Sequence, residues 1–225
     1  MIKTVLVVAA HPDDEVLGCG ATLARHCAEG ARVDALIMTD GIGAREPANH
    51  VSEVTLRKAA ARRACDELGI QKLTLLAYPD NRMDEIALLD IVRDIERIVL
   101  ELRPEVIYTH SASDVNIDHR RVHDAVVSAC RPLPGDCVQR LLFFETPSST
   151  AWRPPSSLPP FAPNWFVDIS DFMPQKLAAL EAYAPEMRAF PHPRSMEAVT
   201  HLAAWRGSMI GVKAAEAFEL GRARI

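Results

Sequence analysis

An imidazole and three carboxylates directly follow an apolar run near the start of the sequence. Residues 3–10 read Lys-Thr-Val-Leu-Val-Val-Ala-Ala, and His11, Asp13, Asp14 and Glu15 come next. An apolar run of this length predicts a buried strand. Ionisable groups at the end of a buried strand need a partner, because an isolated charge is costly to remove from water. A divalent cation would supply that partner and would favour hydrolytic or Lewis-acid chemistry.

A second polar group follows the apolar run at 105–109. It reads Tyr-Thr-His-Ser-Ala-Ser-Asp-Val-Asn-Ile-Asp-His from residue 108 and contains His110, Asp114, Asn116, Asp118 and His119. In a doubly wound sheet, the first and fourth strands flank the crevice where strand order reverses. The two groups therefore meet if this fold is correct. Catalytic zinc sites use three protein ligands, so two ligands from the first group and one from the second would complete such a site.

Both groups also have ordinary structural explanations. The acidic triplet 13–15 is compatible with a helix N-cap followed by first-turn acids. His119 and His123, one helical turn apart, are compatible with an exposed helix face. The joint occurrence of the two groups favours metal binding by His119. His110 ends a strand and is expected to point into the same crevice, in contact with the substrate or with a ligand.

The elements that must position these residues alternate over the first 145 residues. Strands are expected at 3–10, 33–39, 72–77, 105–109 and 140–145, and helices at about 15–29, 51–68, 86–102 and 118–130. Gly30 and Gly69 lie where helix C-caps are expected. Strands separated by helices predict right-handed crossovers. The predicted class is therefore α/β, a doubly wound, mostly parallel Rossmann-like sheet with helices on both faces.

Composition changes after residue 145. Residues 146–164 are rich in proline, serine and threonine and predict an irregular loop that walls the active site. A short strand at 165–169 and helices at about 174–184 and 195–219 are expected next. Too little sequence follows the loop for an independent core, so we expect residues 1–225 to form a single domain.

Composition and charge exclude several partner classes. A net charge of −5 gives no basic surface for nucleic acid. No stretch of about 18 apolar residues predicts a membrane span, and the opening residues do not resemble a secretion signal, so a cytoplasmic protein is expected. Five cysteines without a CxxC spacing predict buried free thiols, with zinc ligation or disulfides as the alternatives. A homo-oligomer is compatible with the apolar content.

The opening group resembles the motif of a known family. Ala10-His11-Pro12-Asp13-Asp14-Glu15, followed by Gly18-Cys-Gly20, is similar to the first motif of the LmbE-like (PIG-L-type) zinc N-deacetylases. Further segments resemble the family in the same order along most of the chain: Arg57 to Gly69, Tyr78-Pro-Asp80-Asn, Asn116-Ile-Asp118-His119, Phe166-Val-Asp168-Ile-Ser with Lys176 and Leu177, Pro191-His192-Pro-Arg194-Ser195, and Ala215-Glu216-Ala-Phe218.

The resemblance implies a role for each matching residue. His11, Asp14 and His119 would hold one zinc ion per chain, and other divalent ions are compatible with these ligands. Asp13 would act as general base on the zinc-bound water. The reaction would remove an N-acetyl group from an N-acetylglucosamine-type sugar or its conjugate, releasing acetate and a free amine. Asp118 would orient a histidine or hold its loop.

One position departs from the family pattern. The family segment often begins with a histidine that stabilises the oxyanion, and here this residue is Asn116. An amide donates a hydrogen bond to an oxyanion but delivers no proton to the leaving amine. Either Asp13 returns that proton, or His110 or His192 supplies the imidazole.

Substrate contacts are expected from five residues near the predicted crevice. These candidates are Arg57, Arg82, Glu145, His192 and Arg194. Arg57 and Arg82 are equally compatible with an exposed surface, whereas the surrounding Pro-His-Pro-Arg-Ser favours Arg194. The alternative functions are an amidase for another N-acyl conjugate, such as a thiol-sugar or an antibiotic intermediate, and a non-catalytic sugar-binding module. No GxGxxG follows the first strand and no GxSxG is present, so a dinucleotide site and a serine hydrolase are disfavoured.

Overall fold

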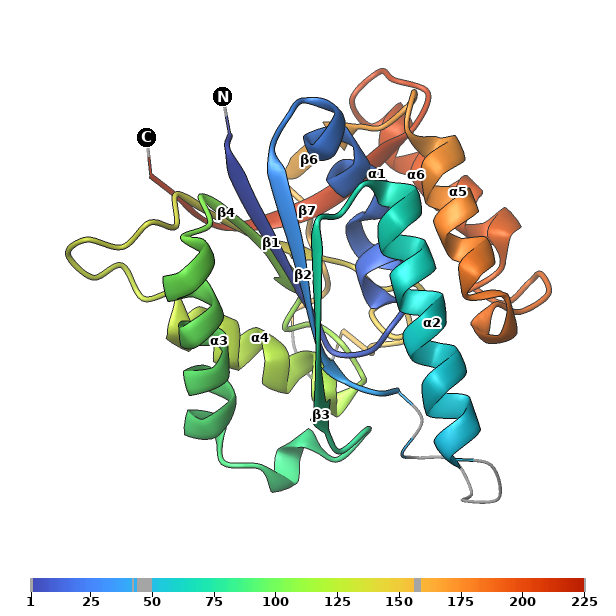
Figure 1. Ribbon diagram of the computed structural model, residues 1–225. Coiled ribbons are helices and arrows are strands. Elements are labelled where there is room, and N and C mark those ends of the chain that lie inside the picture. The colour runs from blue at the N-terminus through green and yellow to red at the C-terminus, as the bar shows by residue number, and fades with distance from the viewer. Residues whose placement is uncertain (1, 42, 44–49, 156–158, 225) are drawn as a thin grey trace.

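A seven-stranded sheet forms the centre of the protein. A computed structural model describes residues 2–41, 43, 50–155 and 159–224 (Figure 1). The strand order is β3-β2-β1-β4-β5-β7-β6. The strands are β1 (Thr4–Ala9), β2 (Arg32–Thr39), β3 (Lys72–Tyr78), β4 (Val106–His110), β5 (Arg140–Phe144), β6 (Trp165–Asp168) and β7 (Ala215–Ala223).

The first five strands are parallel, and their order reverses between β1 and β4. Val5 of β1 pairs with Val33 of β2 on one side and with Val106 of β4 on the other. The carboxyl ends of β1 and β4 therefore lie side by side at the switch point, where open α/β sheets bind their ligands. The predicted α/β fold class is confirmed.

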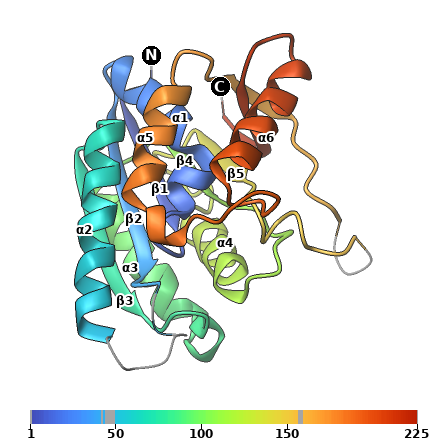
Figure 2. The ribbon, with the colours of Figure 1, turned by 90° about the vertical axis from the view of Figure 1, so that its right-hand side faces the viewer.

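Helices cover both faces of the sheet (Figures 1 and 2). They are α1 (Asp14–Ala28), α2 (His50–Leu68), α3 (Leu88–Leu102), α4 (Ile117–Ala129), α5 (Met173–Ala182) and α6 (Met196–Ser208), with short 3₁₀ helices η2 (Met83–Glu85) and η3 (Ala184–Glu186). The described part of the chain contains no helix of the length and apolar character that a membrane span requires.

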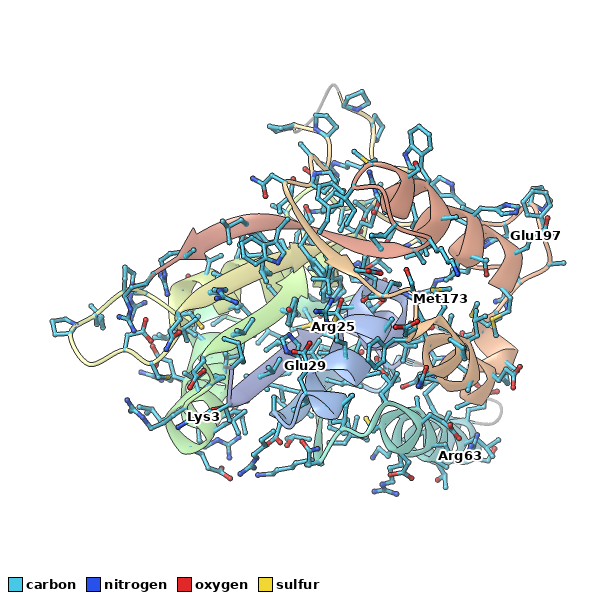
Figure 3. All side chains as sticks on the ribbon, turned by 90° about the horizontal axis from the view of Figure 1, so that it is seen from above. Lys3, Arg25, Glu29, Arg63, Met173 and Glu197 are labelled. Atoms are coloured by element: carbon cyan, nitrogen blue, oxygen red, sulfur yellow. The ribbon has the colours of Figure 1, made fainter. Side chains whose placement is uncertain are left out.

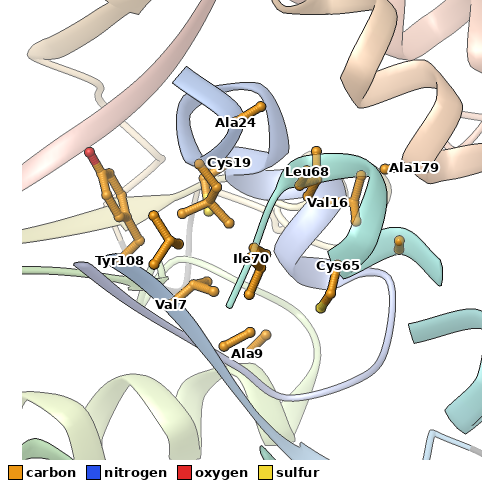
Figure 4. Packing of buried hydrophobic residues seen from close by; sticks show 14 of the residues in the cluster. Val7, Ala9, Val16, Cys19, Ala24, Cys65, Leu68, Ile70, Tyr108 and Ala179 are labelled. Carbon is orange, nitrogen blue, oxygen red and sulfur yellow. The ribbon is translucent and has the colours of Figure 1, made fainter. Parts of the chain in front are cut away.

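The side chains of β1 alternate between the two cores. Val5, Val7 and Ala9 pack in the core under α1, α2 and α5, part of which is shown in Figure 4. Leu6 and Val8 pack in the opposite core, under α3 and α4. Because successive side chains of a strand point to opposite faces, an uninterrupted apolar strand indicates a sheet that is buried on both sides.

The C-terminal region corrects one prediction. A single helix over 195–219 is wrong: α6 ends at Ser208, and β7 runs antiparallel between β5 and β6. Gly211 adopts a left-handed conformation (φ 78°) in the turn that separates the two elements. Alanine and glutamate in β7 favour a helix by propensity, but pairing with two neighbouring strands outweighs that weak preference.

Two further predictions concern the cysteines and the loop 146–164. The five cysteines are free thiols, as expected, but only Cys19, Cys65 and Cys130 are buried, whereas Cys27 and Cys137 are half-buried. The predicted irregular loop 146–164 contains residues 156–158, which lie outside the described residues. Its first part, from Thr146 to Trp152, consists of hydrogen-bonded turns.

Helix α1 is kinked, and two other elements support the kink. Cys19 departs from helical geometry (φ −148°, ψ 18°). The Glu216 carboxylate of β7 accepts the N–H groups of Ala21 (3.2 Å) and Thr22 (2.7 Å). Lys176 of α5 donates to the Leu17 carbonyl at 2.9 Å and pairs with Glu216 at 2.5 Å. The groups that the kink leaves without helical partners are thereby satisfied.

Contacts at both ends of α1 fix its position on the sheet. A Cβ atom on Gly18 would lie 2.2 Å from the Phe144 ring, so the helix approaches β5 at a distance that only glycine permits. At the other end, Arg25 pairs with Glu29 at 2.8 Å (Figure 3) and donates to the Asp168 carbonyl of β6 at 2.9 Å. These contacts therefore hold the N-terminus of α1, which lies a few residues after β1, in a fixed position.

Candidate active site

Three side chains from two βα units converge at the switch point. His11 follows β1, Asp14 is the first residue of α1, and His119 lies in the first turn of α4. His11 Nδ1 lies 3.0 Å from Asp14 Oδ2 and 3.2 Å from His119 Nε2, and the last two atoms are 3.1 Å apart. Zinc bonds of about 2.0–2.1 Å at tetrahedral angles place ligand atoms about 3.3 Å apart. The three predicted ligands therefore have the spacing of a metal site.

The surroundings of the three atoms fit a cation. All three residues are buried. Asp14 Oδ1 is buried and accepts no hydrogen bond from the described residues. Burial opposes a charge on His119, yet Asp14 and Asp114 outweigh it and raise the pKa of His119 to about 9. Burial opposes a charge on His11 as well, but Asp118, Asp14 and Asp80 raise its pKa well above the usual value. The site therefore attracts positive charge.

Carboxylates behind the ligands fix the orientation of both imidazoles. His11 Nε2 lies 3.1 Å from Asp118 Oδ2 and 3.1 Å from Asp80 Oδ1. His119 Nδ1 lies 3.0 Å from Asp114 Oδ2. Each ring thus donates one N–H to a carboxylate and leaves the other nitrogen free for a metal, as in many metalloenzymes.

The same carboxylates hold the surrounding loops. Asp118 accepts the backbone N–H groups of Asn81 (2.6 Å) and Met83 (3.0 Å). Asp114 accepts the hydroxyls of Ser149 (3.0 Å) and Thr150 (2.9 Å). Asp118 was predicted to orient a histidine or hold a loop, and both contacts are present.

Asp13 lies beside the metal ligands in an unusual backbone conformation. Its φ is 110°, a region that non-glycine residues rarely adopt. Its carboxylate is buried between two guanidinium groups, with Oδ1 3.2 Å from Arg194 and Oδ2 3.4 Å from Arg57. Burial raises the pKa of the Asp13 carboxyl, and the charge of Arg194 limits that rise. A carboxylate in this environment is suited to accept a proton.

A polar cavity of about 250 Å³ opens onto these groups. Its lining combines metal-site residues, amides, hydroxyls and two arginines: His11, Gly41, Arg57, Asp80, Asn81, Asn116, His119, Ser148, Ser149, Glu186 and Arg194. Three of the residues expected to act on substrate, Arg57, Asn116 and Arg194, therefore lie at the cavity. Such a polar lining suits a hydrophilic ligand of sugar size.

Asn116 has a structural contact as well. Its side-chain oxygen accepts the Asp118 N–H at 2.8 Å and forms the N-cap of α4. Its amide nitrogen donates to Asn81 Oδ1 at 3.0 Å. The second N–H of this nitrogen is therefore available as a donor toward a substrate in the cavity.

His110 and His192 lie outside the cavity lining. His110 is fully buried behind His119, with ring centroids 4.0 Å apart, and its Nε2 accepts the Ala10 N–H at 2.9 Å. Burial and the neighbouring His119 hold the pKa of His110 well below its usual range. His192 accepts the Arg194 N–H at 3.0 Å and meets the edge of Trp152. Both imidazoles thus support neighbouring groups.

Arg82 and Glu145 also lie apart from the cavity. The Arg82 side chain is 64 % exposed and pairs with Glu85 at 2.8 Å. Glu145 pairs with Arg206 at 2.8 Å and lines a separate, much smaller cavity beside α6. The structure does not bring either residue to the metal ligands.

Several residues at the site were given no role from the sequence. Asp80 and Asn81, noted above only as part of a family-like segment, lie just after β3, so a polar pair near a strand end was a usable signal. Glu186 lies in η3 and pairs with Arg57 Nη1. Its position in a proline-containing turn between helices gives no comparable signal.

The chain matches a known family over the region that builds this site. The protein-family model described as "PIG-L: GlcNAc-PI de-N-acetylase" matches residues 6–130, which include His11, Asp13, Asp14 and His119. The protein belongs to the PIG-L (LmbE-like) deacetylase family. Family membership and the buried His/Asp cluster together identify the protein as an amide hydrolase of the PIG-L type with a metal-binding site.

Individual PIG-L relatives extend the similarity to the rest of the chain. The uncharacterized deacetylase YaiS of Escherichia coli is 31% identical over 187 residues, which cover 80% of this chain and 90% of YaiS. A probable N-acetyl-alpha-D-glucosaminyl L-malate deacetylase 2 of Bacillus cereus is 33% identical over 141 residues, covering 60% and 64%. The crystal structure of the conserved protein TT1542 from Thermus thermophilus superposes with a TM-score of 0.79 at 29% identity, covering 100% and 97%.

Proposed function

We propose that the protein is a zinc-dependent N-deacetylase that acts on an N-acetylglucosamine-type sugar or its conjugate. The observation that carries this proposal is the convergence of His11, Asp14 and His119 beside the buried carboxylate of Asp13. One zinc ion per chain held by these three side chains would polarise the acetyl carbonyl and make water acidic near neutral pH.

Asp13 performs the proton transfers in this proposal. Its carboxylate takes the proton of the attacking water while Arg57 and Arg194 hold its two oxygens in place. As the C–N bond breaks, the same carboxyl delivers this proton to the leaving nitrogen, so that a neutral amine and acetate are released. His110 and His192 are not needed for this step, since Nε2 of His110 and Nδ1 of His192 accept backbone N–H groups.

The cavity lining supports a hydroxyl-rich substrate. The Asn116 amide nitrogen is the candidate donor to the oxyanion, because its bond to Asn81 uses only one of its two N–H groups. Arg57, Arg194 and the two serines at 148 and 149 supply donors for sugar hydroxyls. The similarity to the probable N-acetyl-alpha-D-glucosaminyl L-malate deacetylase 2 of Bacillus cereus supports the same substrate class.

Amine release tests the proposal. Zinc-loaded protein is incubated with N-acetylglucosamine, N-acetylglucosaminyl malate and an N-acetylated amino acid, and amine and acetate are quantified. We expect equimolar amine and acetate from at least one of the sugars and zinc near one per chain. Release from the amino acid alone would favour the broader amidase function, and zinc-loaded protein without any amine release would contradict both.

A further inference from the structure

The strained backbone of Asp13 is held by a buried chain of two side chains. The Asp13 N–H donates to Glu15 Oε2 at 3.0 Å, and the Tyr183 hydroxyl donates to Glu15 Oε1 at 2.7 Å. Glu15 is fully buried and Tyr183 is 1 % exposed, so water does not compete for these hydrogen bonds. A non-glycine residue at φ 110° persists only where surrounding contacts over-determine it.

A second chain of contacts reaches the Asp13 side chain from the same turn. Glu186, three residues after Tyr183, pairs with Arg57 Nη1. Arg57 Nη2 donates to the Pro12 carbonyl at 2.9 Å and lies 3.4 Å from Asp13 Oδ2. The Arg57 guanidinium also lies over the Tyr183 ring, 5.9 Å from its centroid.

We propose that the turn 183–186, which follows α5 and consists of Tyr183 and η3, is a positioning element for Asp13. The turn fixes the backbone through Tyr183 and Glu15, and the carboxylate through Glu186 and Arg57. The proposal rests on the proposed function, in which Asp13 moves the proton. Tyr183 is not among the residues that line the catalytic cavity, so its hydroxyl acts through Glu15 and not on the substrate.

The variant Tyr183→Phe tests this role because it removes one oxygen. Misplacing a reacting group by about 1 Å costs up to ~100-fold in rate, so we expect kcat to fall on the order of 10-fold. KM is expected to stay within about twofold, because substrate contacts are retained. Zinc content should not change. Tyr108→Phe is the matched control: it removes another buried hydroxyl, which contacts His26 at 2.9 Å. Equal kcat values in the two variants would overturn the proposal.

Glu15 supplies a rescue experiment. Glu15→Ala removes both acceptor oxygens, and we expect kcat to fall on the order of 100-fold. Glu15→Gln keeps one acceptor for the Asp13 N–H and should recover most of that loss. Equal kcat in Glu15→Ala and Glu15→Gln would overturn the proposal.

A measurement independent of turnover separates this inference from the proposed function. In ¹⁵N-labelled protein, Tyr183→Phe should shift the Asp13 amide resonance, whereas Tyr108→Phe should not. This experiment also decides the matter if Glu15→Ala does not fold. A shift in a protein that deacetylates no substrate would uphold the positioning and contradict only the function. An unmoved Asp13 resonance in Tyr183→Phe would overturn the positioning.

Discussion

His11 and His119 each turn one nitrogen toward the other candidate ligand atoms and the second nitrogen toward a carboxylate. For His119 the carboxylate is Asp114, at 3.0 Å from Nδ1. Asn in place of Asp114 loses the negative charge and turns one of the two accepting oxygens into a donor, although both oxygens accept hydrogen bonds here. Losing such a partner typically lowers metal affinity roughly 10–100-fold, and we expect that decrease for Asp114→Asn. Competition with a zinc chelator measures it, and unchanged affinity would contradict the assigned orientation.

Asp13 should be separable from metal binding. Asp13→Asn keeps the side-chain size but removes the group that accepts a proton. General-base catalysis contributes roughly 10²–10⁴-fold, so kcat should fall within that range. Zinc binding should remain close to one ion per chain, because Asp13 is not among the three converging ligand atoms. Rate assays and metal analysis of the same preparation check both statements, and a kcat equal to that of the wild type would refute the role of Asp13.

The sequence predicted that the side chains of His11, Asp14 and His119 converge because two of them lie close to a strand end. His11 and Asp14 follow β1 within five residues, and the parallel neighbour β4 leads directly to His119. The surroundings were harder to predict. His110 looked equally available, yet packing behind His119 buries it and the Ala10 N–H occupies Nε2. A hydrogen bond from the backbone of a neighbouring strand cannot be predicted from the spacing of side chains in the sequence.

At the scale of elements, the kink of α1 depends on the buried pair Lys176–Glu216. Lys176→Met would leave the Glu216 carboxylate buried without its cation, and breaking one partner of such a pair costs roughly 3–5 kcal/mol. We expect the free energy of unfolding to fall by that amount in urea titrations. Lys72→Met breaks the exposed pair with Glu101 and should change it by less than about 1 kcal/mol. Equal losses in the two variants would contradict the support assigned to Lys176.

The role of β7 in this support also shows why the sequence predicted some strands and not others. Strands β1 to β5 are apolar and separated by helices, so local periodicity predicts them. Strand β7 carries Glu216 toward α1 and begins Ala-Glu-Ala, residues that favour a helix by local propensity. Its strand conformation follows from pairing with β5 and β6, which are distant in sequence. Such long-range pairing lies outside what a local pattern predicts.

At the scale of the whole molecule, zinc should stabilise the fold. The three ligands come from the ends of two different βα units, so the intact site exists only in the folded state. A ligand at 1,000 times its Kd stabilises the native state by about 4 kcal/mol, which corresponds to roughly 8–16 °C in Tm for a chain of this size. Calorimetry with and without a chelator measures this. An unchanged Tm would contradict a site assembled by folding.

The stabilisation by zinc should also grow with pH. Without a cation, folding raises the pKa of His119 from 6.5 to about 9, so its protonation stabilises the fold fully below pH 6.5. That contribution is lost as the pH rises through 9. Zinc must displace this proton from His119, so the difference in Tm between zinc-loaded and metal-free protein should widen between pH 6.5 and 9. Parallel curves over this interval would contradict the coupling.

Three statements about the whole molecule stay predictions from the sequence. They are the single domain, the homo-oligomer and the cytoplasmic location. Gel filtration with light scattering checks the oligomer directly.

Strand β7 follows every other described element along the chain, yet it supplies the carboxylate that caps the second half of α1. During translation, the ribosome therefore releases the metal ligands long before it releases Glu216. A nascent chain has His11, Asp14 and His119 outside the exit tunnel while the helix that orients Asp14 still lacks its final support. The metal ligands should accordingly reach their final arrangement only after this strand has been synthesised.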